Sequence, residues 1–150
     1  MSAGPFDVRR IAIEVARPLR VMVLRAGMPG DPAIFAGDDE PETAHFGAFA
    51  ANGLVGVVTA MHHPRPGAGA EEWQLRGMAT LPAVRGQGHG AALIRAAEAF
   101  VREQGGRIAW FNARRAAEGF YAHVGYTTVS EEFDVPGIGP HVVMEKRLAG

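Results

Sequence analysis

The chain has no cysteine and only two serines among its 150 residues. The absence of cysteine excludes disulfide bonds, thiolate metal sites and a cysteine acyl-enzyme. Ser2 lies near the N-terminus, and Ser130 precedes two glutamates without the Gly-x-Ser-x-Gly pattern of a serine nucleophile. We therefore expect no covalent acyl-enzyme, and any acyl transfer is expected to proceed by direct attack.

The chain also lacks an excess of charge of either sign, since 15 Lys+Arg against 16 Asp+Glu give a formal net charge of −1. This balance offers no electrostatic footprint for nucleic acid or an anionic membrane.

Residues 1–7 hold no basic segment followed by an apolar core, so a cytoplasmic location is expected. The uncharged run 43–64 is interrupted by Asn52-Gly53, which favours a type I′ hairpin over a membrane span. The length and the 47% hydrophobic content fit one domain spanning 1–150.

A glycine-rich segment, MATLPAVRGQGHGA at residues 78–91, joins a predicted strand to a predicted helix. Glycines at 86, 88 and 90 have no Cβ, so their amides can converge on an anion at short distance. The first N–H groups of a helix have no intrahelical partner and carry the positive end of the helix dipole. Arg85 adds a full positive charge. The segment therefore predicts a phosphate-binding loop.

The same segment also matches, loosely, the dinucleotide fingerprint of a Rossmann unit, as Gly86-x-Gly88-x-x-Ala91. That fold expects repeated βαβ units and a carboxylate about 20 residues later, at the end of the next strand. Asn112 stands at that place. A nicotinamide-dependent oxidoreductase is therefore the weaker alternative.

Hydrophobic periodicity and turn residues predict alternating strands and helices. The expected strands are 8–14, 44–50, 54–61, 73–81, 107–111, 126–134 and 141–148. The expected helices are 15–24 with Pro18 in its first turn, a helix from the glycine loop to Gly105-Gly106, 116–124, and a short helix around 33–35. In the strand 73–81 we expect Trp73, Leu75, Gly77, Ala79 and Leu81 to share one face.

Two motifs, Arg85-x-x-Gly88-x-Gly90 and FYAHVGY at 120–126, resemble those of the GCN5-related N-acetyltransferase (GNAT) superfamily. Arg85-x-x-Gly88-x-Gly90 resembles the acetyl-CoA pyrophosphate motif, and FYAHVGY at 120–126 resembles the aromatic-Tyr-x-x-x-Gly-aromatic signature. The resemblance covers nearly the whole chain, and residues 139–146 resemble a branch of small bacterial members. It implies an α/β fold with a mixed, mostly antiparallel central sheet of about six to seven strands, flanked by helices and splayed at the acetyl-CoA site.

The resemblance implies acetyl-CoA as cosubstrate and assigns its binding residues. Backbone groups of Met78 and Thr80 are expected to bond the pantetheine arm. The glycine loop is expected to bind the pyrophosphate. Asn112 is expected near the β-alanine portion of the arm, with capping of the next helix as the alternative. At His89, where the family often has an aliphatic residue, we expect the amide to bind. The expected set is Met78, Ala79, Thr80, Arg85, Gly86, Gln87, Gly88, His89, Gly90, Ala91 and Asn112.

The resemblance makes Tyr121 the group that faces the CoA sulfur and assists thiolate departure, while Phe120 fills the core. His45, Glu72, His141 and water are the alternatives for the general base. His62-His63 lacks further ligand spacing, so no metal is expected. The acidic residues Asp38, Asp39, Glu40 and Glu42 either form a solvated loop or attract a cationic amine.

The sequence thus predicts an N-acetyltransferase that moves an acetyl group from acetyl-CoA to a primary amine in a ternary complex. A small molecule, a peptide N-terminus and a lysine side chain are the alternatives for the acceptor. A non-catalytic acyl-CoA-binding or sensing domain of the same fold is the alternative function, and release of free thiol would distinguish the two. The expected protein is a monomer or homodimer without nucleic-acid or membrane partners.

Overall fold

A computed structural model describes residues 6–26, 28 and 30–148 of the chain. It contains a sheet in the order β1-β2-β3-β4-β5-β8-β6, with β7 also paired to β8. Within the described residues, β4 and β5 pair in parallel and all other neighbours are antiparallel. The strands are β1 (Asp7–Ile11), β2 (Ala44–Ala50), β3 (Gly53–Met61), β4 (Glu72–Thr80), β5 (Ile108–Arg114), β6 (Thr127–Thr128), β7 (Phe133–Val135) and β8 (Gly139–Arg147). The predicted α/β fold with a mixed, mostly antiparallel sheet is confirmed.

The sheet has one more strand than expected because the predicted strand 126–134 is broken into β6 and β7. At the break, the Ser130 side-chain oxygen accepts the hydrogen bond of the Val143 amide at 2.8 Å, in place of a backbone carbonyl. The strand ladder is therefore interrupted there, and both short strands flank the same edge of β8.

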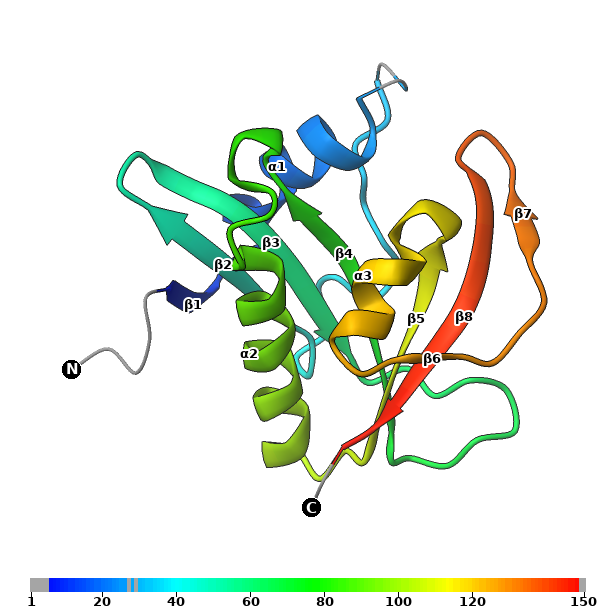
Figure 1. Cartoon of the computed structure of the whole chain (residues 1–150). Coiled ribbons are helices and arrows are strands. Elements are labelled where there is room, and N and C mark those ends of the chain that lie inside the picture. The colour runs from blue at the N-terminus through cyan, green and yellow to red at the C-terminus, as the bar shows by residue number, and fades with distance from the viewer. Residues whose placement is uncertain (1–5, 27, 29, 149–150) are drawn as a thin grey trace.

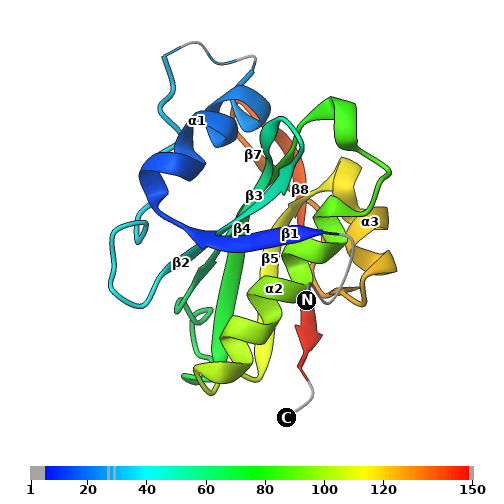
Figure 2. The same ribbon diagram turned by 90° about the vertical axis from the view of Figure 1, so that its left-hand side faces the viewer.

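Helices cover both faces of the sheet. Helix α1 (Ile13–Leu24) lies on one face, and α2 (His89–Glu103) and α3 (Glu118–His123) lie on the other, as Figures 1 and 2 show. Two short 3₁₀ turns, η1 (Pro82–Val84) and η2 (Arg115–Ala117), precede α2 and α3. Helix α2 packs through an apolar stripe at helical spacing, formed by Leu93, Ile94, Ala97 and Val101.

Two expectations around α1 are wrong. The helix begins at Ile13, so Pro18 is its sixth residue and lies beyond the first turn. The carbonyl that loses its partner belongs to Glu14, which is exposed to water. No short helix forms around Ala33, because that residue adopts a left-handed φ of 50°. Its amide donates to the Asp31 carboxylate at 2.8 Å, which fixes an extended turn in place of a helix.

The predicted hairpin β2–β3 is present, but its turn is not of type I′. Among the described non-glycine residues only Ala33 has a positive φ, so Asn52 does not adopt the conformation that type I′ requires. Gly53 takes the positive φ instead, at 118°. The pairing register shifts between Ala48 and Phe49, which absorbs the extra residue as a bulge.

A second bulge lies in β4. Val57 pairs with Ala79 and Thr59 with Arg76, so Val58 faces both Gly77 and Met78. Gly77 adopts a φ of 65°. The extra residue inverts the alternation of the strand: Trp73 and Leu75 pack in the cluster with α2, whereas Ala79 packs in the cluster with α1. The expected common face of this strand is therefore wrong.

The parallel strands β4 and β5 stay together over only a short distance. Three residue pairs join them, from Glu72 with Ile108 to Gln74 with Trp110, and beyond these the strands diverge. At the paired end, Arg65 donates to Glu72 of β4 at 2.8 Å and to Glu145 of β8 at 2.7 Å. The Trp110 indole also donates to the His63 carbonyl at 2.9 Å. The two strands are thus closed at this end and splayed at the other, as predicted.

Candidate active site

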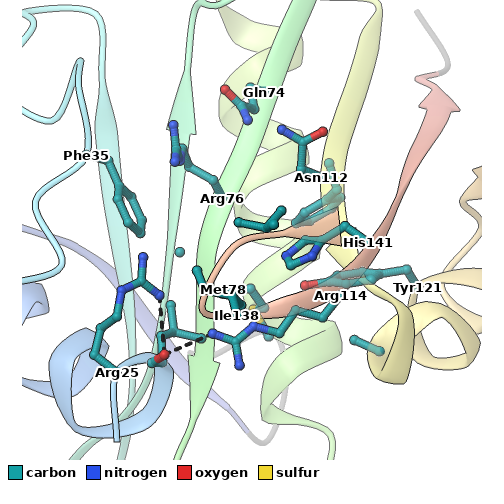
Figure 3. A pocket seen from close by; sticks show the side chains of 15 residues that line it. Arg25, Phe35, Gln74, Arg76, Met78, Asn112, Arg114, Tyr121, Ile138 and His141 are labelled. Carbon is teal, nitrogen blue, oxygen red and sulfur yellow. Dashed lines mark hydrogen bonds between the residues drawn. The ribbon is translucent and has the colours of Figure 1, made fainter. Parts of the chain in front are cut away.

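A cleft of about 260 Å³ lies where β4 and β5 part. Side chains from both strands, from the end of α1, from α3 and from the β7–β8 hairpin line it (Figure 3). Of the sequence-predicted residues, Met78, Asn112, Tyr121 and His141 belong to its wall. Asn112 lies within β5, paired with Val143, so it does not cap the next helix.

The glycine loop brings free amides to the start of α2. Ala92 is the first residue to bond back into the helix, to the Gly88 carbonyl at 3.1 Å, so the preceding amides are those that a helix leaves without a partner. No side chain caps the helix and its first turn holds no acidic residue. The amides of His89, Gly90 and Ala91, with the Arg85 charge nearby, therefore form an arrangement that fits a pyrophosphate.

Close packing requires two of the loop glycines. A Cβ on Gly90 would lie 2.9 Å from Met78 Cε and 3.0 Å from Phe120 Cζ. Gly88 has a φ of 99°, and a Cβ there would lie 2.8 Å from the Phe6 ring. Phe120, expected in the core, is 37% exposed because it packs on the start of α2 while its neighbour takes the buried position.

The loop residues do not all present a free amide. The Arg85 amide donates to the Pro82 carbonyl at 3.3 Å and the Gln87 amide to the Val84 carbonyl at 3.2 Å. The Arg85 guanidinium donates to the Thr80 carbonyl at 3.1 Å. Ala79 packs beneath α1, away from the cleft. Arg85 and Gln87 can therefore contribute their side chains to an anion but not their amides.

Tyr121 lies on α3 with its ring against Phe111 of β5, the ring centroids being 4.3 Å apart. The ring is buried, and the hydroxyl group lies at the cleft (Figure 3). In the described part of the chain this hydroxyl has no hydrogen-bond partner. Burial raises the pKa of Tyr121 well above its usual value, although the charge of Arg114 opposes the shift. The hydroxyl group is therefore protonated and free to donate.

Only one of the three candidate bases lies in the cleft. Glu72 binds Arg65 at the end where β4 and β5 are paired, and this hydrogen bond lowers the pKa of Glu72. His45 lies in a separate buried cluster. His141 lines the cleft, and its Nδ1 is 2.8 Å from the Gly139 carbonyl, which directs Nε2 away from that carbonyl. Figure 3 shows the His141 ring beside Asn112 and Tyr121.

His45 belongs to a cluster built on Arg20, a helix residue that is fully buried. Arg20 binds both carboxylate oxygens of Asp38, at 2.8 and 3.1 Å, and the Thr59 hydroxyl at 2.9 Å. His45 Nδ1 is 2.7 Å from that hydroxyl. Burial alone would raise the pKa of Asp38, but hydrogen bonds from Arg20 and the Phe35 amide outweigh it and lower the pKa. Both oxygens of the Asp38 carboxylate are thus bonded inside the protein, so Asp38 is not available to a cationic amine.

Sequence reasoning missed three arginines of the cleft, Arg25, Arg76 and Arg114. A signal existed for Arg76, because a charged residue inside a strand of apolar residues must point to a polar surface or find a partner. For Arg114 the only signal is compositional, since residues 85–115 hold six arginines against two glutamates.

The two adjacent histidines have structural partners. His62 Nε2 is 2.8 Å from the Ala70 carbonyl, and its ring stacks on Trp73 with centroids 4.7 Å apart. Among the described residues, no group of three or more His, Cys, Asp or Glu could hold a metal ion. None of the described helices is long and apolar enough to cross a membrane.

Comparison with known proteins gives a consistent result. Residues 34–148 match the family described as "Acetyltransferase (GNAT) domain". The chain is 34% identical over 143 residues to the "Uncharacterized N-acetyltransferase YitI" of Bacillus subtilis, covering 95% of this chain and 96% of that protein. A GCN5-related N-acetyltransferase from Kribbella flavida has a similar fold, with a TM-score of 0.72 and 21% identity over 98% of this chain and 100% of that one. An aminoglycoside 6′-N-acetyltransferase solved with coenzyme A gives a TM-score of 0.71 and 17% identity, covering 96% and 98% of the two chains.

Proposed function

The chain belongs to the GNAT acetyltransferase family and is an acyltransferase, and from this premise we propose that it transfers an acetyl group from acetyl-CoA to a primary amine by direct attack. The observation that carries the proposal is the splay of β4 and β5, which leaves one edge of each strand unpaired beside the cleft. The Leu81 amide bonds β3, so the alternation of a strand turns the backbone groups of Met78 and Thr80 to the open edge. These groups can bond the amides of a pantetheine arm.

In this proposal, the glycine loop and the residues of the cleft bind different parts of the cosubstrate. The amides of His89, Gly90 and Ala91 would bind the pyrophosphate, assisted by the Arg85 side chain. Asn112, exposed on β5, would bond the arm between them. The thioester then lies near Tyr121, and an N–H on the open edge of β4 would polarise its carbonyl oxygen.

In the proposed reaction a new bond forms between the amine nitrogen and the acetyl carbon, and the bond from that carbon to sulfur breaks. The amine proton passes to His141 Nε2 or to water, and the sulfur leaves as a thiolate. Burial keeps the pKa of Tyr121 far above that of a thiol, about 8.5, so the hydroxyl group stabilises the thiolate by a hydrogen bond rather than by full proton transfer. The thiolate finally takes up a proton from solvent or from the protonated base and becomes a thiol.

Two measurements test this function. Saturating acetyl-CoA, at about 100 times its dissociation constant, is expected to stabilise the fold by about 2.7 kcal/mol, while NAD gives no shift. Addition of an amine is then expected to release free thiol, which a thiol reagent reports cleanly because the chain has no cysteine. Binding of acetyl-CoA without thiol release from any amine would instead identify the non-catalytic binding domain.

A further inference from the structure

Three arginines give the cleft a positively charged wall. Arg25, Arg76 and Arg114 line it, and no Asp or Glu side chain is among its described lining residues. The three arginines reach it from the end of α1, from β4 and from β5, so they are far apart in the sequence and meet only in the fold (Figure 3). A surface of this kind repels a cationic acceptor and attracts an anionic one.

Arg114 and Arg25 share one backbone acceptor. Both guanidinium groups donate to the Leu24 carbonyl at the end of α1, at 2.9 and 3.2 Å respectively. Arg25 also lies 3.3 Å from the Asp31 carboxylate, whereas Arg114 has no ion pair among the described residues. A guanidinium has five N–H donors, so Arg114 keeps unused donors after this single bond.

Arg76 is the second arginine of the cleft that has no ion pair with a carboxylate among the described residues. Its guanidinium lies 4.2 Å from the centroid of the Phe35 ring, which fixes its position without using its N–H donors. Burial lowers the pKa of both Arg76 and Arg114, and neighbouring arginines lower it further. Asp38 opposes this shift at Arg76 without reversing it, and neither guanidinium forms an ion pair with a carboxylate among the described residues.

We propose that the acceptor is a small primary amine with a carboxylate close to the amine, as in free α- and β-amino acids, and that Arg114, beside Arg25, binds this carboxylate while Arg76 adds to the positive potential of the cleft. Arginine is suited to the task because its planar fork binds a carboxylate with two parallel hydrogen bonds. The cleft of about 260 Å³ is small and also receives the end of the cosubstrate, which favours a free amino acid over a peptide. The inference rests on the proposed function, since it names the acceptor of the same cleft.

The test compares acceptors that differ only in the carboxylate. L-alanine, L-methionine and L-phenylalanine are each assayed against the corresponding decarboxylated amine and the corresponding amide, with acetyl-CoA saturating and free thiol as readout. A tripeptide with the same first residue forms a further arm. For at least one amino acid, kcat/KM is expected to exceed that of its decarboxylated amine by roughly 10- to 100-fold, the value of charged hydrogen bonds.

Arg114→Gln is expected to raise KM for that amino acid at least tenfold and to bring its preference over the decarboxylated amine to within about threefold of unity, whereas Arg76→Gln is expected to have a smaller effect in the same direction. Arg9→Gln is the matched control, because it removes the same type of charge from β1, where Arg9 is exposed and paired with Asp7 at 2.7 Å. It is expected to keep the wild-type preference. Circular dichroism and acetyl-CoA affinity by calorimetry show whether each variant is folded.

Equal or faster turnover of the decarboxylated amines or the tripeptide overturns the inference and leaves the proposed function intact. An unchanged preference in Arg114→Gln also overturns it. If the protein binds acetyl-CoA but releases no thiol with amines of either kind, the inference and the proposed function both fail.

Discussion

The two tyrosines of the chain show how surroundings set the role of a residue. Both rings pack against Phe111 in the core. The Tyr126 hydroxyl donates to Glu98 at 2.8 Å, and Lys146 binds the same carboxylate at 3.1 Å, so this hydroxyl group is fully used inside the protein. The Tyr121 hydroxyl opens on the cleft instead. Identical chemistry is thus structural at one position and available to a ligand at the other.

Replacing Tyr121 by Phe removes one hydroxyl group and keeps the ring packing. If the hydroxyl stabilises the departing thiolate, kcat is expected to fall roughly 10²- to 10³-fold, while acetyl-CoA affinity changes little. Thiol release under saturating substrates and calorimetry measure the two quantities. Tyr126→Phe is the matched control: it is expected to lower stability by about 1 kcal/mol or more and to leave kcat within about twofold. A Tyr121→Phe enzyme with wild-type kcat, chemistry being rate-limiting, would falsify the role of the hydroxyl.

At the residue scale, the sequence predicted Tyr121 from its signature but not the arginines around it. A signature specifies residues at fixed spacing along one helix, whereas Arg25, Arg76 and Arg114 come from three elements. Their meeting depends on how α1 and the splayed strands are placed in space. No local pattern contains that information.

Among the elements, helix α2 is unusual in how it starts. Its N-cap is Gly88, which has no side chain to satisfy the first amides, and the usual polar caps contribute about 1 kcal/mol to stability. The helix is nonetheless well packed through its apolar stripe. Omitting the cap leaves the amides and the positive end of the dipole for an external anion.

Substitutions at Gly86 test this element, because a Cβ there meets nothing within 4 Å and only its φ of 82° is restrictive. Asn and Asp tolerate this conformation better than other residues and differ in charge. Gly86→Asp is expected to weaken acetyl-CoA binding at least tenfold more than Gly86→Asn, and added salt is expected to reduce the difference. Calorimetry at low and high salt measures both. Equal affinities of the two variants would show that the phosphates bind elsewhere.

The bulge of β4 marks the limit of prediction for the elements. Periodicity located this strand within one residue at each end. The extra residue at Gly77, however, turns the side chains that follow it to the opposite face of the sheet from the one that simple alternation predicts. Gly77 is in tight contact with Arg20 and Phe35, where a Cβ would lie 3.1 Å from each. The bulge is therefore set by packing against α1, a contact between segments more than fifty residues apart.

For the whole molecule, the Arg20 cluster is the connection between distant segments. Through Asp38, His45 and Thr59 it joins α1 to the loop before β2, to β2 itself and to β3. All four side chains are buried, so their protonation affects the stability of the fold as a unit. Sequence patterns did not predict this cluster, because its members come from four separate segments of the chain.

Burial lowers the pKa of His45, so the unfolded chain binds its proton more readily than the folded protein. Stability is therefore expected to be greatest above the unfolded pKa of about 6.5 and to decrease as pH falls from there towards the lower folded pKa. Denaturant midpoints at successive pH values between 7 and 5 measure this decrease. His45→Gln is expected to reduce it, whereas the control His63→Gln, which removes an exposed histidine, leaves it unchanged. An identical pH profile of stability for wild type and His45→Gln would show that protonation of His45 does not cause the decrease.

The three residue pairs between β4 and β5 have a mechanical consequence. On one side lie β1 to β4 with α1 and α2, and on the other β5 to β8 with α3, so the sheet consists of two plates joined along a short hinge (Figure 1). Arg65 and Trp110 fasten the hinge at its closed end. Away from the hinge, the two plates are connected by the Glu98 carboxylate of α2, which binds Tyr126 and Lys146, and not by further strand pairing between β4 and β5. A pantetheine arm that bonds the unpaired edges of β4 and β5 would connect the two plates where the protein leaves them apart. The protein is therefore expected to be more rigid with its cosubstrate bound than without it.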